Sequence, residues 1–278
     1  ASITTIPPSP YKDLAFPLNA YTHALLLQEG KAIYPHYGLF QNDTTSLQAA
    51  QQFSTNLLMA RLPASPCRIL EVAVSLGSIL PLLSQQGYAV NGITPDAQQI
   101  AYIQKSVSSA VSVSYHSLKD FEAPAESFDV ILFQESAQHI EPLTIFNKAL
   151  DLLPLSGDLV IIDEFALEYD EAGTERLHLL NNMVALAERF GFELIEHMDL
   201  STMAISTLDY LSRITHIHRQ RLIQDLGLSD EQLTQLDASN RLHHRKYASG
   251  HYGYALLDFR KKTMPKWRPQ TLTANQKT

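Results

Sequence analysis

The feature that most constrains this chain is an alternation, between residues 67 and 200, of short apolar runs and longer amphipathic segments. Each run is rich in β-branched or aromatic residues and is bounded by turn residues, which predicts a strand. The runs occupy residues 67–74, 88–93, 111–115, 128–133, 158–165 and 192–198. Strands that alternate with helices form a mostly parallel sheet with helices on both faces, and such sheets bind ligands at the carboxyl ends of their strands.

Helical spacing of apolar residues fills the stretches between these runs. Residues 96–107 predict one helix, and residues 174–192 predict another that ends before Gly191. The apolar face of the second helix is expected to consist of Leu179, Met183, Leu186 and Phe190. A further helix is expected within 44–62, after a proline-rich beginning.

A seventh strand is predicted at residues 253–261, more than fifty residues after the sixth. Apolar residues recur near helical spacing in this gap, and Ser229 and Gln232 have the spacing of a capping box. We therefore expect a helical insertion, or lid, before the last strand. The predicted domains are an N-terminal extension and cap at 1–66, a core at 67–200 and 251–262, the insertion at 201–250 and a basic tail at 263–278.

The composition excludes several classes of protein. The 278 residues are 45% hydrophobic and 18% charged, which is typical of a globular chain. The single cysteine, Cys67, cannot form an internal disulfide or a zinc site of several thiolates. No apolar run approaches the roughly 20 residues that span a membrane, and the N-terminus lacks the pattern of a signal peptide. We therefore expect a soluble, cytoplasmic protein without a transmembrane segment.

The charges argue against nucleic acid as a partner. The net charge is −8, and most acidic residues lie within 67–200, whereas the charged residues of 259–278 are all basic. We expect this short basic tail to be a solvated chain end.

The histidines do not predict a metal site. His216 and His218 are two residues apart on a predicted helix and therefore point to different faces, and the adjacent His243 and His244 meet the same difficulty. The alternative left open is that separate helices bring one member of each pair together.

The loop after the first predicted strand gives the first chemical signal. Residues 68–78 read RILEVAVSLGS, a buried strand followed by small residues. This segment resembles the motif acid-x-Gly-x-Gly-x-Gly of the class I S-adenosylmethionine-dependent methyltransferases. Glu71 keeps the acid and Gly77 the last glycine, whereas Ala73 and Ser75 replace the other two. Each replacement adds a Cβ where the amino-acid end of the cofactor passes in that family.

Further motifs follow in the order of the family. Residues 88–99, YAVNGITPDAQQ, resemble the second strand and turn of the cyclopropane-synthase-like branch, Gly-x-Thr-Leu-Ser-x-x-Gln. Thr94 stands where most methyltransferases place an acid for the ribose, and Gln99 stands at the branch's glutamine, whose amide can hydrogen-bond a ribose hydroxyl. After the third strand, Ser117 takes the place of the family's acid for the adenine amino group.

The fourth and fifth motifs complete the resemblance. Residues 127–140 place a glutamate, Glu135, after the fourth strand and a histidine, His139, four residues later, a common form of the family's fourth motif. Residues 153–164 resemble the Leu-x-Pro-Gly-Gly-x-Leu turn and fifth strand, and residues 250–260 resemble the last strand.

The resemblance implies an α/β, Rossmann-like fold with a seven-stranded, mostly parallel sheet, helices on both faces, an N-terminal helical cap and a helical insertion before the last strand. It also implies S-adenosylmethionine as the cofactor. The residues expected to bind it are Glu71, Ala73, Ser75, Gly77, Ile93, Thr94, Gln99, Ser117, Leu118 and Gln134.

Methyl transfer is an in-line displacement, so the enzyme positions the acceptor and, where required, removes a proton. Glu135 and His139 are the first catalytic candidates, because both follow the fourth strand and a histidine is a base at neutral pH. Two alternatives stay open: His139 caps or supports the next helix, and Glu135 holds the cofactor's ammonium group or orients His139.

The N-terminal part supplies two further catalytic candidates. Residues 34–40, YPHYGLF, resemble the His-Tyr-Gly-aromatic element that covers the active site in small-molecule and lipid methyltransferases, although Leu39 intervenes before the aromatic residue. The resemblance implies that Tyr37 touches the cofactor or acceptor and that His36 is an alternative base. Packing within the cap is the competing role for both.

The predicted function is therefore methyl transfer from S-adenosylmethionine to a small, apolar molecule or lipid, by a chain compatible with a homodimer. Whether oxygen, nitrogen or carbon accepts the methyl group is left open. The alternative is a catalytically inactive methyltransferase-like subunit for binding or assembly, because Ala73, Ser75, Thr94 and Ser117 depart from the common residue types. A nicotinamide-dependent oxidoreductase is disfavoured because its fingerprint is absent.

Overall fold

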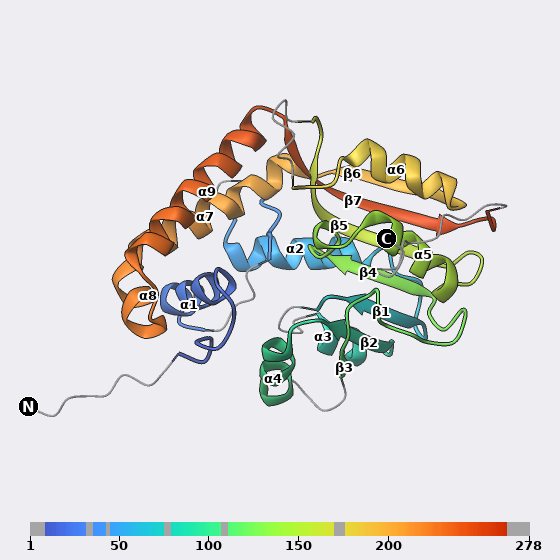
Figure 1. Cartoon of the computed structure of the whole chain (residues 1–278), viewed down its shortest axis with the longest axis horizontal. Helices are drawn as coiled ribbons and strands as arrows, with labels where there is room; N and C mark the ends of the chain where they lie inside the picture. The colour runs from blue at the N-terminus through green and yellow to red at the C-terminus, as the bar shows by residue number, and fades with distance from the viewer. Residues whose placement is uncertain are drawn as a thin grey trace, which may run out of the picture. The chain divides into compact units, whose positions relative to one another are not determined.

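The computed structural model describes residues 9–31, 36–42, 45–74, 79–106, 111–169 and 176–265 (Figure 1). The chain divides into two compact units. The helical unit consists of Ala1–Ser54 and Ser201–Gly250, and the sheet unit of Thr55–Leu200 and His251–Thr278. Each unit is therefore built from two segments that are distant in the sequence.

The sheet unit contains a seven-stranded sheet in the order β3-β2-β1-β4-β5-β7-β6. The strands are β1 (Arg68–Val72), β2 (Ala89–Thr94), β3 (Ser112–Tyr115), β4 (Val130–Gln134), β5 (Asp158–Ala166), β6 (Phe192–Asp199) and β7 (Tyr252–Lys261). Strands β1 to β5 pair in parallel, whereas β7 is antiparallel to both of its neighbours, β5 and β6. The predicted seven-stranded, mostly parallel sheet is confirmed.

The place of each strand in the sheet explains its sequence pattern. β5 is buried over its whole length, and β4 is buried except for its last residue, Gln134. Such central strands are covered on both faces and therefore read as continuous apolar runs. β6 is an edge strand, and its residues alternate between exposed and partly buried after Phe192.

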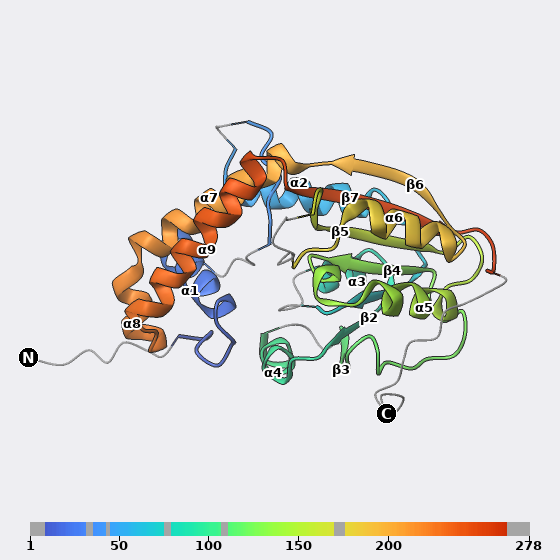
Figure 2. The same cartoon turned by 45° about the horizontal axis from the view of Figure 1, so that its top comes forward.

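Helices cover both faces of this sheet. The helices are α3 (Leu80–Gln85), α4 (Ala97–Ser106), α5 (Pro142–Leu152) and α6 (Leu180–Arg189), with the 3-10 helix η1 (Ala137–His139). Phe146 of α5 and Met183 of α6 share a core cluster with Ile93 of β2, so both helices lie on one face (Figure 2). A Cβ at the neighbouring Gly92 would lie 3.0 Å from the side chain of Leu80 in α3. Because successive residues of a strand point to opposite faces, α3 covers the other face.

The predicted start of the helix within 174–192 is wrong. Residues 170–175 lie outside the described residues, and α6 begins only at Leu180. Leu179 has extended backbone angles and forms a parallel β-bridge with Ala166, so it lies beside the last residue of β5. Leu179 therefore does not belong to the buried face of the helix, which Leu180, Met183 and Ala187 provide instead.

The helical unit contains α1 (Leu18–Glu29), α7 (Ser201–Ile217), α8 (Arg219–Leu226) and α9 (Asp230–Ala248), while α2 (Leu47–Met59) crosses the boundary between the units. α7 and α9 lie side by side in both views (Figures 1 and 2). The predicted capping box is present, because the Ser229 side chain accepts from the Gln232 N–H and the Gln232 side chain accepts from the Ser229 N–H. Of the helices in the described ranges, none has the length and apolar character that crossing a bilayer requires.

A buried polar chain ties the first described residues to two helices of the helical unit. The Ser9 hydroxyl lies 2.9 Å from His23 Nδ1, and His23 Nε2 lies 2.8 Å from Asp225 Oδ2. His23 belongs to α1 and Asp225 to α8, where Arg221 also pairs with the carboxylate. Hydrogen bonding satisfies these buried groups, so this series of polar side chains stabilises the packing of α1 on α8.

The turn between α6 and β6 generates a stability prediction. Gly191 has a left-handed φ of +82°, and a Cβ there would lie 2.1 Å from the backbone oxygen of Thr263. Gly191→Ala should therefore lower the free energy of unfolding by roughly 2–5 kcal/mol, through backbone strain and a forced shift of the chain. Urea unfolding followed by circular dichroism measures this change.

Gly87→Ala is the matched control. Gly87 is also left-handed, at φ +89°, but its Cβ would meet nothing closer than the Ser65 side chain at 3.4 Å. It should cost only about 1 kcal/mol of backbone strain. Equal losses of unfolding free energy in the two variants would contradict a steric conflict between the Gly191→Ala side chain and the Thr263 backbone.

Candidate functional site

Parallel pairing brings several predicted site residues to one edge of the sheet. β1 pairs with β2 and β4 so that Glu71 lies opposite Gly92 and Leu132. Because these strands run in the same direction, the residues that follow them meet at their common carboxyl end. Ala73 follows β1, and Glu135 follows β4.

Glu71 is a buried acid at this edge. Its side chain is 5% exposed, and no hydrogen-bond partner for Oε2 is found among the described residues. Burial raises the pKa of the carboxyl group to about 8, because the charged form loses its hydration. Glu71 therefore keeps its proton at neutral pH until a positively charged or strongly donating group reaches it.

The backbone turns sharply just after β1. Ala73 adopts φ +54°, in the left-handed region that glycine enters without steric cost. This conformation explains why a glycine suits the position in the motif that the segment resembles. Ser75 and Gly77, two of the predicted cofactor residues, lie outside the described residues.

The end of β2 holds an internal hydrogen-bond network. The Thr94 hydroxyl donates to Gln99 Oε1 at 3.0 Å and accepts from the Asp96 N–H at 3.2 Å. Asp96 Oδ1 accepts from the N–H groups of Gln98 and Gln99, which begins α4. Thr94 and Gln99, which were each predicted to bind the cofactor, are thus hydrogen-bonded to each other, and Asp96 acts as a helix cap.

The two apolar side chains Ile93 and Leu118, both predicted to bind the cofactor, are buried like those of Glu71 and Thr94. Ile93 is 1% exposed and Leu118 is 3% exposed, and both belong to the core cluster under α5 and α6. Ser117 donates to Asp120 Oδ2 at 3.1 Å and accepts from the Asp120 N–H at 3.2 Å. The Ser117 hydroxyl is therefore already hydrogen-bonded to Asp120 before any ligand binds at this edge.

The loop after β4 is held on both sides. Glu135 has a left-handed φ of +58°, and its N–H donates to the Ile162 carbonyl at 2.8 Å. The hydroxyl of Tyr254 donates to Glu135 Oε1 at 3.2 Å. Ser136 donates to the carbonyl of Val72 at 2.9 Å, which joins this loop to the end of β1. Gln134, another predicted cofactor residue, is partly buried at the end of β4.

His139 ends η1 and is accessible to solvent. Partial desolvation and the neighbouring His178 lower the pKa of His139, whereas Glu164 raises it. The helix that follows, α5, has Glu141 as its N-cap and no side-chain capping bond. Capping of α5 is thus not the role of His139.

Tyr254 and His178 are site residues that the sequence did not single out, and Asp163, a candidate for acceptor contact from its place in the fifth strand, instead holds the turn of Gln138. Asp163 is fully buried and accepts from the Gln138 N–H at 2.9 Å and from Gln138 Nε2 at 3.0 Å. Burial raises its pKa to about 7. For Tyr254, the only available signal was its place in β7, where it pairs opposite Glu164 of β5.

The N-terminal candidates belong to the helical unit. His36 is buried with its Nδ1 3.0 Å from the Tyr37 carbonyl, and burial lowers its pKa to about 4. Gly38 exchanges hydrogen bonds with the Thr207 hydroxyl at 2.8 and 3.0 Å. A Cβ on Gly38 would lie 2.7 Å from Ala50 Cβ, which explains the glycine of the His-Tyr-Gly element. At neutral pH His36 is therefore an uncharged, packed side chain.

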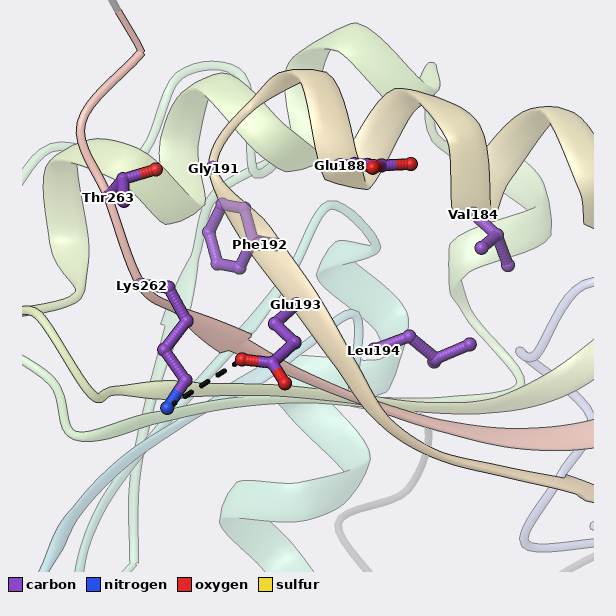
Figure 3. A pocket seen from close by; sticks show the side chains of 8 residues that line it. All are labelled: Val184, Glu188, Gly191, Phe192, Glu193, Leu194, Lys262 and Thr263. Atoms are coloured by element: carbon purple, nitrogen blue, oxygen red, sulfur yellow. Dashed lines mark ion pairs between the residues drawn. The ribbon is translucent and has the colours of Figure 1, made fainter.

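A pocket of about 400 Å³ lies elsewhere on the sheet unit. It is lined by residues of α6, of the start of β6 and of the segment just after β7, where Lys262 lies 3.7 Å from Glu193 (Figure 3). Lys261 pairs with Phe192, and Arg260 with Asp158, the first residue of β5. This pocket is thus at the amino end of β5, opposite to the edge that carries Glu135.

Comparisons with known proteins agree with this geometry. Residues 70–161 match the family model described as "Methyltransferase domain". This match and the strand order show that the chain contains a methyltransferase domain with a Rossmann-like fold. The comparison with curated proteins finds no match.

Several solved structures share the fold. A [4+2]-cyclase, SpnF, matches with a TM-score of 0.75 and 20% identity over 94% of this chain and 100% of that one. A putative sarcosine dimethylglycine methyltransferase from Galdieria sulphuraria gives 0.75 and 15% over 88% and 98%. A cyclopropane synthase from Mycobacterium tuberculosis gives 0.75 and 18% over 91% and 96%.

The left-handed backbone of Ala73 predicts that a substitution to glycine stabilises the protein at this position. Ala73→Gly should raise the free energy of unfolding by about 0.5–1 kcal/mol, because relief of the left-handed strain exceeds the added freedom of glycine in the unfolded chain. Ala185→Gly, at an exposed position inside α6, should lower it by about 1 kcal/mol. Chemical unfolding of both variants measures this contrast. A loss of unfolding free energy in Ala73→Gly as large as that in Ala185→Gly would contradict it.

Proposed function

We propose that the protein is an S-adenosylmethionine-dependent methyltransferase that acts on a small, apolar molecule or lipid. The observation that carries the proposal is the buried Glu71 carboxyl at the carboxyl end of β1, whose Oε2 has no hydrogen-bond partner in the part of the chain that the structure describes. The family match over residues 70–161 supports the same activity.

The residues at this edge fit the cofactor. S-adenosylmethionine, when bound, supplies a reactive methyl group on a positively charged sulfur and carries an ammonium group. We assign Glu71 to hold the ammonium group, because that contact would satisfy Oε2 and favour the charged carboxylate. Thr94 and Gln99 are assigned to the ribose, and Ser117 with Leu118 to the adenine.

Glu135 and His139 are assigned to the acceptor side of the site. The Tyr254 hydroxyl orients the Glu135 carboxylate, and the left-handed backbone of Glu135 directs the chain away from β4. Because the pKa of His139 is lowered, its ring is uncharged at neutral pH and can take a proton from the molecule that receives the methyl group. Tyr37 is assigned as a cap residue that contacts the acceptor.

The acceptor class rests on the chain's composition and on its structural neighbours. Few charges and many aromatic residues in 1–66 favour an apolar acceptor. Similar structures include a mycolic acid cyclopropane synthase and a geranyl diphosphate C-methyltransferase from Streptomyces coelicolor, the latter with a TM-score of 0.64 and 13% identity over 92% of this chain and 100% of that one.

The second candidate is a methyltransferase-like protein without methyl transfer. The favouring observations are the strained Ala73 and the engagement of Ser117 with Asp120. The similarity to a structure described as a [4+2]-cyclase supports the idea that this fold serves other activities. Cofactor binding and turnover separate the two candidates.

Cofactor binding should release a proton from Glu71. With a pKa of about 8, the group is mostly protonated at pH 7, and a bound ammonium group lowers that pKa, so roughly one proton should leave per cofactor bound. Calorimetric titration with S-adenosylmethionine in two buffers of different ionisation enthalpy measures the number of protons released.

Glu71→Gln should abolish this proton release. It should also weaken the binding of S-adenosylmethionine about 10- to 100-fold, the loss expected when a hydrogen bond to a charged group is removed. Glu188→Gln, an exposed change on α6, should leave both quantities at the wild-type value. No binding by the wild-type protein at millimolar S-adenosylmethionine would overturn the proposed enzyme.

His139→Ala should lower kcat about 10²- to 10⁴-fold while leaving the affinity for S-adenosylmethionine unchanged, as expected for loss of a proton acceptor. The measurement is S-adenosylhomocysteine formation with a panel of isoprenoid alcohols, isoprenoid diphosphates and fatty acids. His197→Ala, at an exposed position of β6, is the control with unchanged turnover. Unchanged turnover in His139→Ala would remove His139 from the catalytic residues.

A further inference from the structure

His178 lies beside the turn that carries His139. Its Nε2 is 2.9 Å from the carbonyl oxygen of Ala137 and 2.8 Å from that of Ile140. Carbonyl oxygens only accept, so Nε2 must carry a hydrogen that is shared between them. This bifurcated bond joins the first residue of η1 to the residue just after it.

The backbone of His178 is fixed independently of its ring. Its carbonyl accepts from the N–H of Ala166, the last residue of β5, at 2.9 Å. The next residue, Leu179, continues the contact through its β-bridge to Ala166. The imidazole is therefore carried by a segment that β5 holds in place.

The opposite side of the same turn is held by β5 itself. The buried Asp163 carboxylate accepts from both the backbone and side-chain nitrogens of Gln138. A turn of three residues has few hydrogen bonds of its own, here from Ile140 to Ala137 and from His139 to Ser136. External partners therefore decide where its side chains point.

We propose that His178 is a positioning residue for His139, holding η1 through its shared hydrogen bond so that the His139 ring stays at the carboxyl end of β4. The consequence for catalysis rests on the proposed methyltransferase function. The structural role itself does not, because it concerns the turn and not the reaction.

Charge gives His178 a second effect on His139. The groups that face the turn are His178 from the segment before α6 and Asp163 and Glu164 from β5, with Glu135 and Glu141 on the same loop. A charged imidazole near His139 disfavours a second positive charge there. Removal of the His178 ring should therefore raise the pKa of His139 and move the acid limb of a pH–rate profile to higher pH.

Two substitutions separate the hydrogen bond from the charge. His178→Gln keeps a side-chain N–H donor but has no imidazole that can take up a proton, whereas His178→Ala removes both the donor and the imidazole. We expect His178→Ala to accelerate hydrogen exchange of the Ile140 amide about tenfold and to raise the pKa of His139, read from its ring resonance by NMR in the full chain. We expect His178→Gln to restore slow exchange while the pKa of His139 stays raised.

Asn182→Ala on α6 is the matched control, because the exposed Asn182 side chain donates to the Tyr169 hydroxyl and has no hydrogen bond to the turn among the described residues. It should change neither the exchange rate nor the pKa. In the methyl-transfer assay, His178→Ala should lower kcat about 10- to 100-fold at an unchanged KM for S-adenosylmethionine, and His178→Gln should recover most of that loss.

The two hypotheses fail in different ways. A chain that binds no S-adenosylmethionine would overturn the proposed function, yet exchange and titration would still measure the effect of His178. Wild-type exchange at Ile140 in His178→Ala would overturn the positioning role even in an active enzyme. Should His178→Ala not fold, His178→Gln decides: fast exchange there contradicts the donor role, and slow exchange with a raised His139 pKa supports it.

Discussion

The parallel pairing of β1 with β2 and β4 is the constraint on which the candidate site depends. It sets Glu71 opposite Gly92 and Leu132, so that the loops after three strands begin at one edge. Side chains then tie these loops together, as Ser136 does when it donates to the Val72 carbonyl. Glu135 and the turn of His139 owe their positions to this edge, because each follows directly from the end of β4.

Burial of polar groups at that edge gives the site its chemistry. Glu71 and Asp163 are both acids whose pKa is raised by desolvation, yet their surroundings differ. Asp163 is satisfied by three donors and acts as an internal support, while Glu71 Oε2 has no partner among the described residues. A buried polar atom without a partner costs free energy, and a ligand that satisfies it recovers that cost. The contrast separates a structural acid from a candidate binding group.

The fold was largely predictable because apolar runs and amphipathic segments report burial directly. The seven strands, the capping box at Ser229 and the mostly parallel sheet followed from local patterns and from the family resemblance. The start of α6 was not predictable from periodicity, because Leu179 fits a helical face in sequence but is taken by a bridge to Ala166. A long-range hydrogen bond there overrides a local preference.

By itself the sequence determined the order of the motifs, the acid at Glu71 and the presence of Glu135 and His139 after a buried strand, since these depend on neighbours along the chain. Only the tertiary structure decided that Ala73 is left-handed, that Tyr254 holds Glu135 and that His178 holds the turn of His139. These contacts join residues between about 40 and 120 positions apart. The physical reason is that a hydrogen bond depends on distance and direction in space, which strand pairing sets and no local pattern encodes.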